Sequence, residues 1–88
     1  MATTEGKVQQ VTIVPQSGTE SFACVLIGPN LDDAEAFVIV RRNTDSQHRG
    51  AFKNSMVDAA VTARANGMNI SIEHNDGDSE ILTLTIGG

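Results

Sequence analysis

The sequence of 88 residues contains no tryptophan and no tyrosine, and its aromatic side chains are three phenylalanines. The hydrophobic core must therefore be built mainly from aliphatic side chains, which each bury less area than a large ring. A domain of this length is near the lower end of what one core can stabilise alone. Association with further copies is a common way for such a chain to gain buried surface.

Cysteine is also scarce, because Cys24 is the only one and no intramolecular disulfide can form. It stands in the apolar run Phe22–Ile27 without a neighbour that would stabilise a thiolate, so a buried, unreactive thiol is predicted. One unpaired cysteine favours a reducing compartment. The polar residues Met1–Lys7 lack the apolar segment of a signal peptide. These features predict a cytoplasmic protein, or a secreted one if a signal peptide has been removed.

Basic residues are few, with six lysines and arginines against eleven acids and a formal net charge of −5. A positive surface supplies most of the affinity for nucleic acids and for anionic membranes, so the charge argues against both partners. No apolar run is long enough to cross a bilayer. The exception is local, since three arginines against Asp45 give positions 41–49 a net charge of +2.

The segment Arg41–Gly50 is predicted to be one long polar loop. Loops are usually solvated surface, which is one interpretation of its charge. The other is a site for an acidic partner or a discrete anionic group, because arginine presents a planar fork of donors to carboxylates, phosphates and sulfates. The candidate ligand-binding residues are Arg41, Arg42, His48 and Arg49.

Hydrophobic patterns predict a single domain of five strands and one helix, with residues 1–6 as a flexible N-terminus. The strands are expected at Lys7–Val14, Ser21–Ile27, Ala36–Val40, Asn69–His74 and Ile81–Ile86. Alternation along the first strand places Val8 and Val11 on opposite faces. The second and third strands are apolar on both faces, which predicts burial on both faces, inside the domain or against a neighbour.

The helix is expected at Ala51–Asn66, because this segment is rich in alanine, contains no proline or glycine and ends at Asn66-Gly67. Its apolar residues form two stripes at about 100° per residue. The narrower stripe is either scattered surface aliphatics or a contact with another subunit. It contains Val57, Val61 and Ala65. The wider stripe contains Phe52, Met56, Ala59, Ala60 and Ala63 and is expected to pack on the sheet. Its anchors are expected to be Phe52 and Met56, with Ile70, Ile72, Leu82, Leu84 and Ile86 among their neighbours.

Three strands, a helix and two strands follow in the order of the OB-fold, a five-stranded barrel. The sequence therefore predicts a mainly β domain, an OB-like barrel with its helix between strands 3 and 4. The segment Ala59–Gly67, with the strands after it, resembles the binding subunits of bacterial AB-type toxins, the cholera-like and subtilase-cytotoxin-like pentamers. In that family subunits pair by edge strands into a ring, helices line a central channel and outer faces bind glycans. The resemblance implies a homo-oligomeric ring, with the pentamer as its expected form.

The chain departs from that family in its cysteine and aromatic content. The toxin subunits carry a disulfide and usually a tryptophan or tyrosine platform, and this chain has neither. The resemblance therefore implies the fold and the assembly, and no glycan-binding residue is transferred from it. The expected ligand class is a glycan or a small anionic group.

Motifs for catalysis, cofactors and metals are missing from the sequence. The acidic clusters Asp32–Glu35 and Asp76–Glu80 do not fit a calcium-binding loop and are typical of turns. No cofactor and no metal site is predicted. The sequence favours a non-enzymatic oligomeric binding or scaffold module. The alternative is a small enzyme or ligand carrier that uses His48, His74 and the acidic turns.

Overall fold

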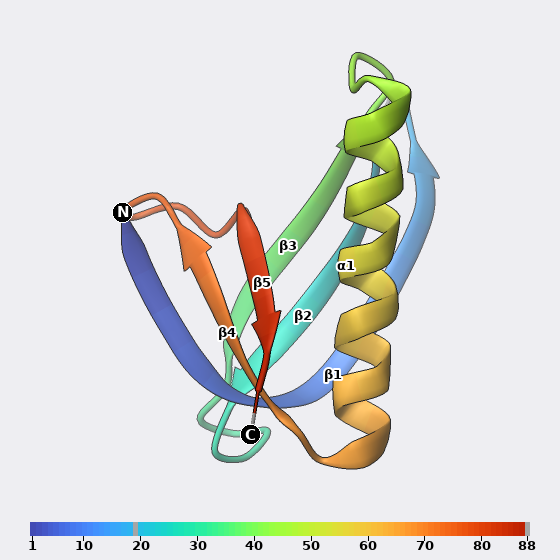
Figure 1. The fold of residues 1–88 in the computed structure, drawn as a ribbon. Helices are drawn as coiled ribbons and strands as arrows, with labels where there is room; N and C mark the ends of the chain where they lie inside the picture. Colours follow the sequence, from blue (N-terminus) through green and yellow to red (C-terminus); the bar gives the residue numbers. More distant parts are fainter. Residues whose placement is uncertain (19, 88) are drawn as a thin grey trace.

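The structure, a computed structural model, describes residues 1–18 and 20–87. Five strands and one helix lie in this part of the chain, and all strand pairs are antiparallel in one sheet of order β3-β2-β1-β4-β5 (Figure 1). The predicted mainly β fold, with its helix between the third and fourth strands, is confirmed. The elements are β1 (Ala2–Ser17), β2 (Glu20–Gly28), β3 (Glu35–Arg42), α1 (Gln47–Asn66), β4 (Asn69–His74) and β5 (Thr83–Ile86).

The longest strand, β1, joins the two halves of the sheet. Its first part pairs with β4 and its second part with β2, and Lys7 pairs with both. Gly6 lies at this change of partner, where an added Cβ would stand 3.1 Å from Ile27 Cγ2. Glycine suits such a close approach, and β1 is strongly curved in Figure 1. Residues 2–6 of the segment predicted to be flexible instead form the start of this strand, because their backbone pairs with β4.

A β-bulge at Gln9 changes which side chains of β1 face the core. The pairing with β2 shifts between Val8 and Gln10, and an extra residue of this kind interrupts the alternation of side chains. Val8 is buried and Val11 packs against the core, so the prediction that they face opposite sides is wrong. The bulge is held from both sides, because Gln9 O accepts a hydrogen bond from Arg64 Nε (2.9 Å) and Gln9 Nε2 donates to Gly28 O (2.9 Å).

The outer strand β3 is joined at one point to the segment before β5. Val38 N–H donates to Ser79 O (2.9 Å), and Ile81 N–H donates to Val38 O (2.8 Å). These hydrogen bonds form a parallel bridge between β3 and the segment before β5. Within the described residues no longer ladder joins β3 to β5. The five-stranded sheet is confirmed, and its closure into a barrel stays a prediction that this bridge supports.

The core lies between α1 and the inner face of the sheet. One ring, Phe37, belongs to it, as the scarcity of aromatic residues predicts. The helix contributes small side chains, which let it approach the sheet closely. The buried core residues are Val8, Ala23, Val25, Ile27, Phe37, Ile39, Ala60, Ala63, Ile70, Ile72 and Ile81.

The outer face of β2 and β3 carries a second set of apolar side chains. Phe22 lies opposite Val40 and Cys24 lies opposite Val38 in the register of the two strands. All four are partly buried, so this face is not closed off from water. Burial of these strands on both faces is therefore incomplete within one chain, and Cys24 is less buried than predicted.

The start of α1 differs from the prediction. Ser46 caps the helix by accepting a hydrogen bond from Arg49 N–H (3.1 Å), so α1 begins at Gln47. It ends as predicted at Gly67, whose φ of 63° is in the left-handed region. Because Arg42 still belongs to β3, the connection is residues 43–46. The prediction of one long polar loop is wrong.

The face of α1 that packs on the sheet lies between the two predicted stripes. Ala60 and Ala63 of the wider stripe are fully buried, but Phe52 of the same stripe is 60 % exposed. Val57 of the narrower stripe packs against the core. The expectation that Phe52 anchors the helix is therefore wrong. Apolar residues are spread around α1, so their spacing alone cannot select the buried face.

Phe37 and Phe52 give a direct test of this helix orientation. Phe37→Ala removes a side chain that is 2 % exposed and should lower the free energy of unfolding by about 3–5 kcal/mol. Phe52→Ala removes an exposed ring and should cost less than about 1 kcal/mol. Urea denaturation of dilute protein measures both values. Equal losses would show that α1 is rotated so that Phe52 faces the core.

Candidate functional site

The four candidate ligand-binding residues lie on two elements at one end of the molecule. Arg41 and Arg42 are the last residues of β3, and His48 and Arg49 lie in the first turn of α1. This is the end with the short β3–α1 connection at the top of Figure 1. The structure brings the four residues to one end, and the pleat of β3 then separates the two neighbouring arginines.

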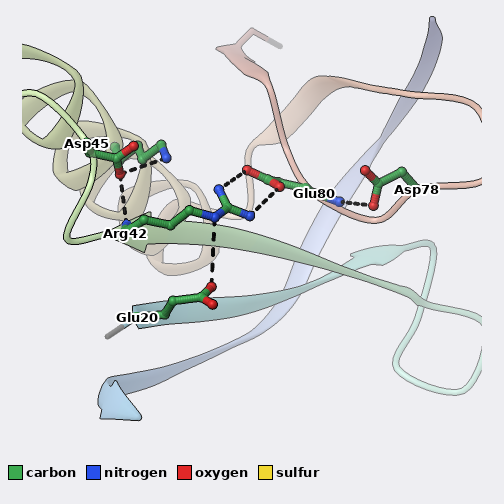
Figure 2. Close-up of polar contacts among 6 residues, drawn as sticks. Glu20, Arg42, Asp45, Asp78 and Glu80 are labelled. Atoms are coloured by element: carbon green, nitrogen blue, oxygen red, sulfur yellow. Dashed lines mark hydrogen bonds and ion pairs between the residues drawn. The ribbon is translucent and has the colours of Figure 1, made fainter. Parts of the chain in front are cut away.

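Arg42 is bound by acidic groups of the same chain (Figure 2). Its Nη1 and Nη2 each donate a hydrogen bond of 2.9 Å to the carboxylate of Glu80. Its Nε lies 3.9 Å from Glu20 Oε2, and Glu20 is its direct neighbour in the register of β2 and β3. The hydrogen bond to Glu80 is the main cause that raises the pKa of Arg42, and the same bond lowers the pKa of Glu80. Two edges of the Arg42 guanidinium are thus already occupied.

Asp45 connects the end of β3 to α1. Its Oδ2 accepts hydrogen bonds from the backbone N–H of Arg42 (2.8 Å) and from Lys53 Nζ (2.8 Å). The side chains of Asp45 and Lys53 are 6 % and 15 % exposed, so the pair is largely removed from water. The hydrogen bond from Lys53 is the largest cause that lowers the pKa of Asp45. This pair fixes the position of the first turns of α1.

Arg41 and Arg49 have no acidic partner within 4 Å among the described residues. The guanidinium of Arg41 lies over Gly50, where an added Cβ would stand 2.9 Å from Arg41 Nε. Arg49 is exposed, and His48 beside it packs its ring edge-on against Phe52, with centroids 4.8 Å apart. The cationic groups open to a ligand at this end are therefore Arg41 and Arg49.

These two arginines line two different hollows, one on each side of α1. Arg41 lines a hollow of about 450 Å³ between α1 and the ends of β1, β2 and β3. Arg49 lines one of about 440 Å³ between α1 and the segment before β5, together with Arg42 and Glu80. The predicted four-residue cluster is thus divided into two surfaces by the helix.

His74 lies in a separate environment at the end of β4. It is 9 % exposed, and its ring centroid is 5.0 Å from that of Phe37. Its Nδ1 lies 3.0 Å from Asn75 O, a carbonyl that can only accept, so Nδ1 carries the proton of the neutral ring. Nε2 then accepts a hydrogen bond from the Thr4 hydroxyl (3.0 Å). His48 and His74 share no partner, so the structure does not assemble them into one site.

The acidic clusters are occupied by turn hydrogen bonds. In the β2–β3 connection Asp33 N–H donates to Asn30 Oδ1 (3.0 Å), and Asn30 Nδ2 donates back to Asp33 Oδ2 (3.2 Å). In the β4–β5 connection Asp78 Oδ1 accepts from Glu80 N–H (3.3 Å). Within residues 1–18 and 20–87, no three His, Cys, Asp or Glu side chains are placed to hold a metal ion.

No protein-family model matches the chain, and no curated protein matches its sequence. The resemblance to the toxin binding subunits therefore depends on the order of elements and on the helix–hairpin segment. In the part of the chain that the structure describes, no helix has the length and hydrophobicity needed to cross a membrane.

The carboxylates of Glu80 and Asp45 predict an acid-sensitive fold. The pKa values of both carboxyl groups are lower in the folded chain than in the unfolded chain. Their contribution to stability is therefore complete at pH values above the ordinary carboxyl pKa. It is lost as the pH falls through the pKa values of the folded chain. Urea denaturation from neutral pH to about pH 3 should show stability falling below about pH 4.

Matched variants assign this pH dependence to the two residues. Glu80→Gln and Asp45→Asn should each be less stable than the wild type at neutral pH and should lose less on acidification. Glu35→Gln removes an exposed carboxylate and should keep the wild-type profile. A wild-type profile in Glu80→Gln would contradict the role given to its pair with Arg42.

Proposed function

We propose that this chain is a non-enzymatic binding module that works as a homo-oligomeric ring. The observation that carries the proposal is that α1 presents uncovered apolar side chains on both of its flanks. A helix on the surface of a monomer needs one apolar face, which α1 already uses against its own sheet. The additional apolar residues are explained by contacts with neighbouring copies of the chain.

The first flank is a groove between α1 and β5. Its volume is about 580 Å³, and Phe52 (60 % exposed) and Leu82 (40 % exposed) form part of it. None of the described residues that line it is charged, although the chain carries a net charge of −5. Depletion of charge is typical of the centre of protein interfaces. A second copy can therefore pack here without bringing like charges together. The lining residues are Phe52, Ser55, Met56, Ala59, Leu82, Leu84 and Ile86.

The second flank is the stripe predicted as an interface. Val57 is used inside the chain, but Val61 is 44 % exposed and Ala65 is exposed as well. Because the two flanks differ, a contact between them is head-to-tail, and repetition of such a contact gives a closed ring when the rotation per subunit allows it. The second copy is thus the occupant that both flanks require.

Two further features support assembly. The core contains one aromatic ring, and the outer face of β2 and β3 keeps apolar side chains such as Phe22 and Val40 partly exposed. The resemblance to toxin binding subunits favours a pentamer by analogy of fold. The working surface for a ligand is the end of the molecule with Arg41, His48 and Arg49, where a glycan or a small anionic group would bind.

Val61→Asp tests the assembly without disturbing the core, because Val61 is exposed in the single chain. Light scattering after size exclusion should give the wild type a mass several times 9.3 kDa. The variant should associate at least about 100-fold more weakly, because an unpaired charge in a buried contact costs about 3–5 kcal/mol.

Thr62→Asp is the matched control, because it adds the same charge at the next, exposed position of α1. It should keep the wild-type mass, and circular dichroism should show the same secondary structure in all three proteins. A wild type that scatters light as a 9.3 kDa monomer at micromolar concentration would overturn the proposed ring.

A further inference from the structure

The hollow lined by Arg41 combines an apolar wall with one unpaired cation. Its apolar lining comes from the sheet and the helix, including Ile13, Ala23, Ile39 and Val57. Ile13 is 59 % exposed, which is unusual for a large aliphatic side chain on the central strand of a sheet. The volume of the hollow, about 450 Å³, is within the range of small-molecule sites.

The charged side chains at this hollow determine whether it favours an anionic or a cationic ligand. Lys53 also lines it, but its ammonium group is paired with Asp45 at 2.8 Å. Arg41 has no such partner among the described residues, so its guanidinium is the free group there. Asp58 is the acidic residue in the lining and lies exposed on α1. It weakens the attraction for an anion without binding Arg41.

Gly50 explains how Arg41 is held over the hollow. Glycine inside a helix is destabilising relative to alanine, and Gly50 lies within α1. Any larger residue would collide with Arg41, since a Cβ at this position would stand 2.9 Å from Nε and 3.0 Å from Nη2. The bare backbone of Gly50 thus gives the guanidinium its place against α1. Ser21, the cross-strand neighbour of Arg41, lines the same hollow, and its hydroxyl donates a hydrogen bond to Pro15 O.

From this arrangement we infer that the hollow binds a small amphipathic carboxylate, whose apolar body packs on Ile13, Ile39 and Val57 while its carboxylate binds Arg41. The guanidinium offers two parallel N–H donors, which match the two oxygens of a carboxylate. The inference rests on the proposed binding function and names its ligand class. It does not depend on the ring, because all of these residues belong to one chain.

Decanoate is the probe, measured by titration calorimetry at pH 7 below its micelle concentration. It should bind at least tenfold more tightly than decanol and decyltrimethylammonium, which share its chain and lack its charge. Arg41→Gln should weaken decanoate binding at least tenfold and leave decanol binding unchanged. Arg49→Gln, which changes an arginine of the other hollow, should stay within twofold of the wild type.

Two variants separate the roles of Asp58 and Gly50. Asp58→Asn removes a negative charge from the lining and should tighten decanoate binding two- to threefold. Gly50→Ala should raise the thermal stability of the helix and weaken decanoate binding, because the added methyl group displaces Arg41. Higher stability with lower affinity excludes simple unfolding as the cause.

Three results would overturn the inference. The first is decanoate binding no tighter than decanol, and the second is equal binding by the wild type and Arg41→Gln. The third is that neither the wild type nor Arg41→Gln binds decanoate and that Arg41→Gln also loses the native mass. That result would show that the hollow is a contact with a second copy of the chain. The proposed ring would survive each of the first two results, since its own test is the native mass.

Discussion

The ion pair between Arg42 and Glu80 lies at the centre of the polar contacts that connect the sheet to the start of the helix. Its two hydrogen bonds connect the end of β3 to a segment 38 residues later. That segment also supplies the bridge to Val38, and it carries Ile81 into the core. The backbone N–H of Arg42 in turn binds Asp45, which holds Lys53 of α1. The edges of the sheet and the start of the helix are therefore fixed by one connected set of polar contacts.

The orientation of α1 follows from this set and decides which apolar residues stay uncovered. With Gly50 beneath Arg41 and Lys53 bound to Asp45, the helix turns the face around Ala60 toward the sheet. Phe52 is then left at the edge, above β5. A helix placed by hydrophobicity alone would have buried Phe52, the largest side chain it has. Polar contacts at the start of α1 thus hold it in the orientation that leaves Phe52 at the surface.

Local signals predicted the elements well, because strand alternation, the Asn66-Gly67 helix end and the turn clusters are all contained in short segments. The bulge at Gln9 was not predictable, since one extra residue leaves the hydrophobic pattern of β1 almost unchanged. The rotation of α1 was not predictable either, because its apolar residues point in several directions. The first turn of α1 was predicted as part of a polar loop, because Gln47–Gly50 contains no apolar side chain that would mark a helix face. The pairing of Arg42 with Glu80 had no local signal at all.

The difference between Arg41 and Arg42 shows how a strand divides a charge cluster that is continuous in sequence. Successive side chains of a strand point to opposite faces, so Arg42 shares the face of Val38 and Val40, while Arg41 shares that of Phe37 and Ile39. The register places Glu20 opposite Arg42 and Ser21 opposite Arg41. One arginine is consequently neutralised by carboxylates, and the other is left with a hydroxyl neighbour and an apolar hollow. The sequence predicted a cationic loop at Arg41–Gly50, and the pleat of β3 determines which of its two neighbouring arginines is paired with carboxylates.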